Sequence, residues 1–181
     1  QDKRFNPGEA LSAKTILKMI ASLSDSITTV NCHFLDQEGV FDFHGVKVRN
    51  LDAFPLIAGY FSGKLKNPVV IAPDKGSLHY AKHASRIIGC EFDSLQKRRL
   101  SGEKVVIETE RLDVEGKDAL ILDDMISTGG TIIEAAKFLR KQGASSVNVG
   151  CVHGVFSQGA EKVRAAVDAL ACTDTIESDI S

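Results

Sequence analysis

The chain has 181 residues, of which 43% are hydrophobic and 25% charged, a composition that fits one or two globular domains. The formal net charge of -2 argues against a nucleic-acid partner, because binding along a phosphate backbone requires a broad basic surface. No apolar run is long enough for a transmembrane helix, so no membrane partner is expected either.

The first third of the chain predicts few regular elements. Residues 8–23 predict a helix, because apolar side chains recur there at nearly helical spacing. The β-branched residues 27–30 predict a short strand, and the broken pattern over 32–45 indicates a functional loop. A second helix is expected over 50–61, although Pro55 disfavours a helix interior.

From residue 69 onward, short apolar strands alternate with helices. Strands are predicted over 69–72, 91–95, 105–107, 119–122 and 146–152, with helices over 77–88 and 130–142 and a glycine at the end of the second helix. This alternation predicts an α/β fold with a parallel twisted sheet flanked by helices. In such sheets the ligand site lies beyond the carboxyl ends of the strands.

The strongest motif is the run Asp-Asp-Met-Ile-Ser-Thr-Gly-Gly-Thr at residues 123–131, directly after the apolar strand at 119–122. Two adjacent carboxylates can accept hydrogen bonds from neighbouring hydroxyls, as a ribose diol offers. The glycine pair lets the backbone approach a ligand, and the N–H groups at the start of the next helix form a phosphate cradle. An ordinary capped helix with acidic surface residues would not require this complete run.

This run resembles the 5-phosphoribosyl-1-pyrophosphate (PRPP) binding signature of type I phosphoribosyltransferases and their relatives. The resemblance implies a site for a ribose 5-phosphate unit, but it does not specify the reaction. The residues that would bind ribose 5-phosphate are Asp123, Asp124, Ser127, Thr128, Gly129, Gly130 and Thr131.

A second motif, at residues 73–77, resembles the pyrophosphate loop of the ribose-phosphate pyrophosphokinase family. Its ligand residues would be Asp74, Lys75, Gly76 and Ser77, with Asp74 also binding Mg²⁺. The family pattern has a second glycine where this chain has Ser77.

The first fourteen residues resemble the ATP-binding region of the same family, and the resemblance assigns ATP contacts to Gln1, Asp2 and Arg4. It also assigns His33 to the ATP phosphates and a catalytic Mg²⁺, whereas an isolated histidine is more often structural. The family arginine that precedes the glutamine falls just outside the chain, and residues 173–178 carry no evident closing element. We therefore expect a piece of a longer polypeptide.

Lys97 and Arg99 match the lysine and arginine of a mobile catalytic loop in this family, although a basic triplet is usually a solvated turn. Cationic side chains aimed at a transferring diphosphoryl group would stabilise its developing charge. The polar residues 101–104 are suited to a lid.

The resemblance extends along essentially the whole chain and implies a tandem of two similar domains. Residues 1–48 would be the C-terminal part of the first phosphoribosyltransferase-like domain, and residues 49–181 the second, with the PRPP-binding loop. Adenine contacts would come from a neighbouring subunit, so the intact protein is expected to be a homo-oligomer. The wide spacing of Cys32, Cys90, Cys151 and Cys172 favours reduced thiols in a cytoplasmic protein.

The expected reaction is Mg²⁺-dependent transfer of the β,γ-diphosphoryl group of ATP to the anomeric hydroxyl of ribose 5-phosphate. Three alternatives stay open: a salvage phosphoribosyltransferase, a catalytically silent regulatory relative, and a PRPP-sensing transcriptional regulator. The motifs at residues 1–4 and 97–99 disfavour the first. The second is disfavoured because Lys97, Arg99, His33 and the two aspartates are all intact, and the third by the acidic balance and the absence of a DNA-binding helix pair.

Overall fold

The computed structural model describes residues 4, 6–35, 37–74, 76–99, 105–107 and 112–180, with only the backbone given at 97–99 and 105–107. The chain separates into two compact units, Gln1–Asp52 and Ala53–Ser181. The contacts divide after Asp52, slightly beyond the division after residue 48 proposed from the sequence. The assignment of these units to two related domains stays a prediction.

The first unit packs one helix on a small sheet. Helix α1 spans Ser12–Ala21, and the sheet has the order β1-β3-β2, with strands Thr28–Val30, Val46–Leu51 and Gly39–Phe43. Strand β1 is parallel to β3, whereas β2 and β3 form an antiparallel hairpin. The prediction of a loop throughout 32–45 was therefore wrong for residues 39–43. The apolar core of this unit comprises Leu17, Leu35, Val46 and Val48.

The predicted second helix begins later than expected. Residues 50 and 51 belong to β3, and α2 spans Phe54–Phe61 with Pro55 in its first turn. Proline is tolerated in the first turn because the N–H it lacks would have no helical partner there. Pro55 therefore marks the start of the helix rather than interrupting it.

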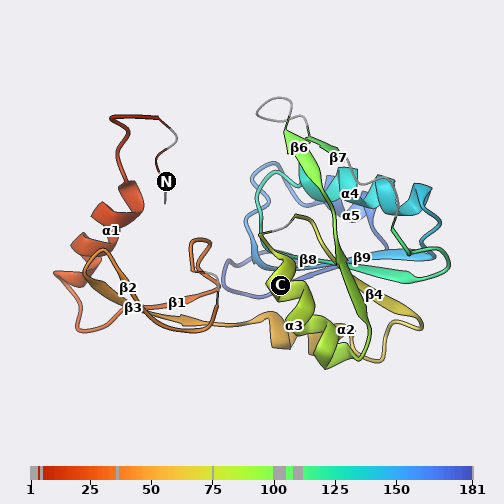
Figure 1. Ribbon diagram of the computed structural model, residues 1–181, viewed down its shortest axis with the longest axis horizontal. Helices are drawn as coiled ribbons and strands as arrows, with labels where there is room; N and C mark the ends of the chain where they lie inside the picture. Colours follow the sequence, from red (N-terminus) through yellow and green to blue (C-terminus); the bar gives the residue numbers. More distant parts are fainter. Residues whose placement is uncertain are drawn as a thin grey trace. The chain divides into compact units, whose positions relative to one another are not determined.

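The second unit is built on a five-stranded parallel sheet with the order β10-β9-β8-β4-β5. Its strands are β4 (Pro68–Ala72), β5 (Glu91–Ser94), β8 (Asp118–Ile126), β9 (Ser146–Gly154) and β10 (Ala169–Cys172). The helices are α2, α3 (Leu78–Ile88), α4 (Gly130–Lys141) and α5 (Glu161–Ala166). Helices α2 and α3 lie on one side of the sheet and α4 and α5 on the other (Figure 1). The predicted parallel α/β sheet is confirmed.

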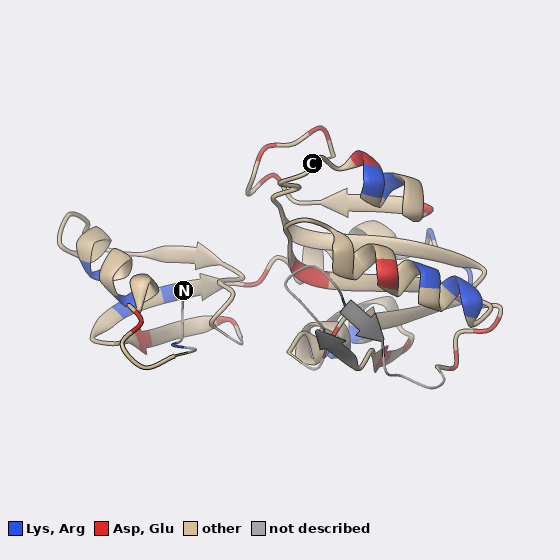
Figure 2. Ribbon diagram, turned by 90° about the horizontal axis from the view of Figure 1, so that it is seen from above, with Lys and Arg blue, Asp and Glu red and all other residues tan. Residues whose placement is uncertain are grey.

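Successive side chains of the central strands point to opposite faces of the sheet and so contribute to the core on both faces. Ile121 and Val149 pack with Ile132 and Leu139 of α4, and all four are fully or almost fully buried. Ala119–Leu122 are completely buried, as expected for a parallel strand covered on both faces. Helix α4 carries Arg140 and Lys141 in its last turn, where they complement the negative end of the helix dipole (Figure 2).

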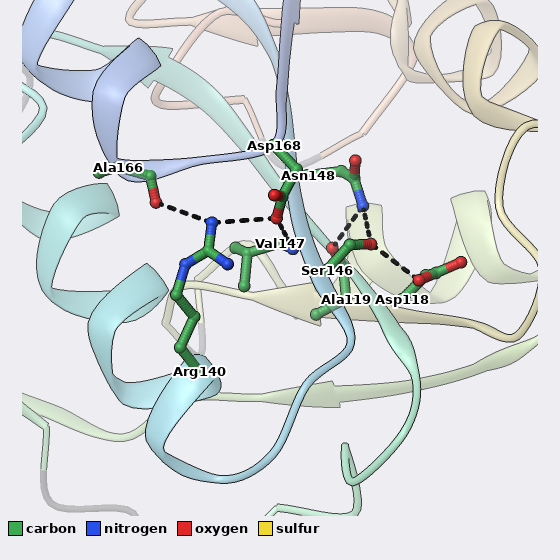
Figure 3. Close-up of polar contacts among 8 residues, drawn as sticks. All are labelled: Asp118, Ala119, Arg140, Ser146, Val147, Asn148, Ala166 and Asp168. Carbon is green, nitrogen blue, oxygen red and sulfur yellow. Dashed lines mark hydrogen bonds and ion pairs between the residues drawn. The ribbon is translucent and has the colours of Figure 1, made fainter.

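The carboxylates of Asp118 and Asp168 accept hydrogen bonds near the N-terminal ends of β8, β9 and β10 (Figure 3). Asp168 accepts hydrogen bonds from Arg140 at 3.0 Å and from the Val147 N–H at 2.7 Å. Asp118 accepts the Ser146 hydroxyl at 2.8 Å and the Lys66 N–H at 2.8 Å. Partial burial opposes ionisation, but these hydrogen bonds outweigh it and lower the pKa of Asp118.

Two parts of the second unit depart from the sequence-based prediction. Residues 105–107 form β7, which pairs antiparallel with β6 (Lys97–Arg99) in a separate two-stranded sheet. Helix α5 and strand β10 were not predicted, because the first has only six residues and the second only four. Strand β10 nevertheless completes one edge of the parallel sheet beside β9. None of the described helices is long and apolar enough to cross a bilayer.

Gly150 lets α2 pack closely on β9. A Cβ atom at this position would lie 2.4 Å from Ile57 Cγ2 and 2.9 Å from Leu122 Cδ2, and both side chains are buried. We expect Gly150→Ala to lower the free energy of unfolding by about 1–3 kcal/mol, the usual cost of overpacking a core. Chemical denaturation measures this change.

Gly59, in α2, supplies the matched control. Nothing lies within 4 Å of a Cβ built there, and its φ is not in the left-handed region. Gly59→Ala should leave stability unchanged or raise it by up to about 1 kcal/mol, because alanine is the better helix former. Equal effects of the two substitutions would contradict the close packing assigned to Gly150.

Candidate functional site

Three of the predicted ligand segments leave the same edge of the parallel sheet. Strands β5, β4 and β8 are neighbours and run parallel, so their carboxyl ends meet at one edge. Residues 95–99 follow β5, residues 73–77 follow β4, and the 123–131 run lies at the end of β8 and the start of α4. The Leu95 N–H donates to the Ala72 carbonyl at 2.9 Å, which holds two of these segments side by side.

The two aspartates of the 123–131 run lie inside the strand rather than after it, because β8 continues to Ile126. Asp124 is buried and Asp123 half-buried, and the Asp124 N–H donates to Asp123 Oδ1 at 3.1 Å. Hydrogen bonding of β8 to β9 at positions 123, 125 and 126 explains the longer strand. The carboxylates are therefore carried on a fixed backbone, which suits them to orienting a ligand.

Gly129 shapes the turn between β8 and α4. It has a φ of 80°, in the left-handed region that favours glycine, and it precedes the first residue of the helix. A Cβ there would lie 2.3 Å from Cγ2 of Val163 in α5, so the Val163 side chain packs directly against this turn. The exposed residues Ser127 and Thr128 stand beside the first turn of α4, where helix N–H groups favour an anion.

The segment after β9 braces the same turn. The N–H groups of Val155 and Phe156 both donate to the Ile126 carbonyl at 3.1 Å, and the Ser157 N–H donates to the Ser127 carbonyl at 3.0 Å. Residue 157 does not cap a helix, because α5 begins only at Glu161 with Ala160 before it. Its backbone instead fixes the loop at the end of β8.

Asp74 organises the loop after β4. Its Oδ1 atom accepts the Gly76 N–H at 2.9 Å, the Ser77 N–H at 3.1 Å and the Ser77 hydroxyl at 3.2 Å. Such a turn aims successive backbone N–H groups toward one carboxylate. Ser77 is buried and immediately precedes α3, so it serves the loop's own structure in the place of the second family glycine. Lys75 lies outside the described residues.

His79 was not singled out from the sequence, yet it follows this loop directly in the first turn of α3. Its Nε2 atom is buried without a hydrogen-bond partner in the described part of the chain. The ring packs on Tyr80 with 3.7 Å between ring centroids, and Tyr80 stacks on Phe54 at 4.2 Å. The side chain of His79 as a whole is only half-buried. Sequence periodicity therefore gives no sign that one of its nitrogens is buried.

Lys97 and Arg99 lie on β6, which begins two residues after Leu95 at the end of the β5 connection. Only the backbone of these two residues is described, so the orientation of their side chains stays a prediction. The lid expected over 101–104 lies outside the described residues.

His33 belongs to the first unit, where it is exposed in a turn after β1. The buried side chain of Asn50 holds this turn: its Oδ1 accepts the Cys32 N–H at 2.9 Å, and its Nδ2 donates to the Gln37 carbonyl at 3.0 Å. Of the three N-terminal residues assigned to ATP, Arg4 is described and exposed, whereas Gln1 and Asp2 are outside the described residues. Asn50 was missed because the last two residues of β3 were assigned to the predicted helix over 50–61.

The donor chemistry at the sheet edge fits Mg²⁺, although the described residues contain no group of three or more His, Cys, Asp or Glu side chains arranged for a metal. Magnesium is usually bound through one or two carboxylates together with substrate phosphates, rather than by a complete protein cage. Asp74 supplies a carboxylate of this kind beside a loop of backbone N–H groups.

Comparison with known proteins identifies the second unit. The family model described as the phosphoribosyl transferase domain matches residues 54–180, which is most of the chain. The chain belongs to this family. The matched region contains the 73–77 loop, the 123–131 run and all five strands of the parallel sheet.

The curated relatives carry a more specific name. The chain is 48% identical over 184 residues to the ribose-phosphate pyrophosphokinase of Methanothermobacter thermautotrophicus, and 44% identical over 183 residues to ribose-phosphate pyrophosphokinase 2 of Archaeoglobus fulgidus. The two alignments cover 100% of this chain but only 63% and 65% of the relatives. The chain thus spans less than two thirds of the length of these relatives.

A solved structure extends the likeness over both units. Phosphoribosylpyrophosphate synthetase from Mycobacterium smegmatis matches with a TM-score of 0.78 and 27% identity, covering 99% of this chain and 60% of its own. A purine phosphoribosyltransferase from Pyrococcus horikoshii matches with a TM-score of 0.53 at 21% identity, which shows a shared fold only.

Gly129 offers a test of the turn between β8 and α4, which is called the phosphate turn because the sequence predicts that it binds a phosphate. In Gly129→Ala the left-handed backbone costs about 1–2 kcal/mol, and the clash with Val163 about 1–3 kcal/mol more. We therefore expect a clear drop in the midpoint of thermal unfolding, together with weaker binding of inorganic phosphate measured by calorimetry.

Gly130→Ala is the adjacent control, because its φ is not in the left-handed region and the nearest atom to an added Cβ is Thr128 Oγ1 at 3.8 Å. Its stability should stay within about 0.5 kcal/mol of the parent chain or rise slightly, since alanine favours a helix. A Gly130→Ala variant as unstable as Gly129→Ala would refute the special role of Gly129.

Proposed function

We propose that the intact protein is a ribose-phosphate pyrophosphokinase, which makes PRPP and AMP from ATP and ribose 5-phosphate. The observation that carries the proposal is the convergence of the 73–77 loop, the 95–99 connection and the 123–131 run at one sheet edge. The names of the curated relatives and of the Mycobacterium smegmatis structure support it.

In this proposal the second unit binds ribose 5-phosphate. Asp123 and Asp124 accept hydrogen bonds from the ribose hydroxyls, and their place within β8 fixes the orientation of the sugar. The 5-phosphate binds at the start of α4, where helix N–H groups and hydroxyls donate to it. The residues of this phosphate site are Ser127, Thr128, Gly129, Gly130 and Thr131.

The diphosphoryl group lies between the acceptor sugar and the nucleotide. Asp74, Lys75, Gly76 and Ser77 form its loop, and Gln1, Asp2, Arg4 and His33 contact ATP. Asp74 and His33 help to hold Mg²⁺, which neutralises phosphate charge when bound. Histidine is an unusual ligand for a hard cation that prefers oxygen, so its contact with the ATP phosphates is the stronger part of its assignment.

Catalysis then consists of positioning and charge stabilisation. The anomeric hydroxyl attacks the β-phosphorus of ATP and loses its proton to solvent, the bond from the β-phosphorus to the bridging oxygen of the α-phosphate breaks, and AMP leaves with that oxygen. Lys97 and Arg99 stabilise the charge that spreads over the transferring oxygens. No covalent intermediate on the protein is required.

Homo-oligomerisation and a cytoplasmic location are further parts of the proposal. The four cysteines of the described structure are free thiols, as is usual in a reducing compartment. A neighbouring subunit would supply the adenine contacts that the resemblance implies.

The reaction is tested with the full-length protein, ATP, Mg²⁺ and ribose 5-phosphate, by following AMP. We expect AMP only when all three are present. PRPP binding without AMP formation, together with base-dependent release of pyrophosphate, would instead identify a salvage phosphoribosyltransferase.

Lys97→Ala and Arg99→Ala should each lower kcat by roughly a hundredfold or more, because each removes a cation that acts on developing charge. Binding of ribose 5-phosphate, measured by calorimetry, should change far less. Arg98→Ala removes the same charge from the position between them and should retain most of the activity. A similar loss in all three variants would contradict the specific assignment of Lys97 and Arg99.

A further inference from the structure

The fold brings together two cysteines that are far apart in the sequence. Cys151 of β9 and Cys172 of β10 are directly paired in the parallel register. Paired residues on neighbouring strands point to the same face of a sheet, and the spacing of strands is about 4.8 Å. That separation lies within the range of about 4.4–6.8 Å between Cα atoms that a disulfide bond requires.

The two thiols already contact each other in the reduced state. The Cys151 thiol donates a hydrogen bond to the Cys172 sulfur, and Cys172 Sγ also lies 3.5 Å from Ser178 Oγ. The bond from Cys151 outweighs the effect of burial and lowers the pKa of Cys172 to about 6. The same bond and burial raise the pKa of Cys151. The two sulfurs are therefore within reach of each other before any covalent bond forms.

Cys172 is also accessible to small reagents. It is half-buried, whereas Cys151 is fully buried. A cavity of about 490 Å³ adjoins Cys172 beside the edge strand of the sheet. The cavity is lined by Leu56, Ile57, Tyr60, Leu170, Ala171, Cys172, Thr173, Asp174 and Ile180.

We propose that Cys172 and Cys151 form a redox pair, in which Cys172 reacts with a hydroperoxide that enters through this cavity and Cys151 resolves the product as a disulfide. The paired register, the contact between the thiols and the cavity at Cys172 carry this assignment. It does not depend on the proposed enzymatic reaction.

The chemistry balances with hydrogen peroxide as the oxidant. The Cys172 thiolate attacks one peroxide oxygen, the O–O bond breaks, and hydroxide leaves, so that Cys172 becomes a sulfenic acid. The Cys151 sulfur then attacks the Cys172 sulfur, and the sulfenic oxygen leaves as water with the thiol proton. Overall, two thiols are oxidised to one disulfide, and one hydrogen peroxide is reduced to two waters once the released hydroxide has taken up a proton.

The new bond would restrain a part of the candidate site. The chain between the two cysteines contains α5, whose Val163 packs against Gly129 in the phosphate turn. Closing this segment removes conformational freedom from the unfolded chain. The oxidised protein should therefore unfold at a higher temperature, and a thiol reductant should reverse the rise.

The test is peptide mapping of the intact native protein after brief treatment with hydrogen peroxide. We expect a Cys151–Cys172 linkage to form ahead of oxidation at Cys90, whose pKa is raised by burial. The Cys151→Ser variant should accumulate a sulfenic acid at Cys172 that dimedone traps. The Cys172→Ser variant should leave the Cys151 thiol unmodified.

Cys32→Ser and Cys90→Ser are controls in which the linkage should form as in the parent protein. The proposal is overturned if native protein shows no Cys151–Cys172 linkage, or if Cys90 is oxidised as fast as Cys172. A linkage that lowers the unfolding temperature would refute the idea that the bond fits the native register. Parent-protein mapping remains decisive even if a serine variant fails to fold.

Discussion

The parallel register around β8 is the constraint on which the rest of the second unit depends. β8 hydrogen-bonds to β4 on one side and to β9 on the other, and its pairing with β9 extends to Ile126. This extension fixes the two aspartates, while the N–H groups that follow β9 hold the carbonyls of Ile126 and Ser127. Carboxylates and phosphate turn are therefore positioned by one ladder of backbone hydrogen bonds, which side-chain substitutions leave largely intact.

The sequence predicted the sheet and the loop motifs because both depend on local patterns. The four consecutive apolar residues at 119–122 fit a strand buried on both faces, and the alternation of such runs with helical segments indicates a parallel sheet. The turn at Gly129 was predictable in the same way, since its backbone requires glycine. Its contact with Val163 was not, because it depends on α5, an element too short to give a periodic signal.

Several residues could be understood only from the three-dimensional contacts. Asn50 was assigned to a helix, yet it lies in β3 and its side chain supports the turn that carries His33. Cys151 and Cys172 have no informative spacing, and the pairing of β9 with β10 alone brings them together. Pairing between distant segments follows from the topology of the sheet, which local propensity does not contain.

The shortness of α5 has a consequence for the dynamics of the site. A helix of six residues has little stability of its own, so it persists only through contacts with its surroundings. Its Val163 closes the phosphate turn at Gly129, and the turn therefore shares the opening free energy of a weak element. Exchange of amide hydrogens would then be faster across α5 and the turn together than in β8, although the turn adjoins this largely buried central strand of the sheet. Ligand entry and local opening would thus occur at the same place, beside a strand that stays closed.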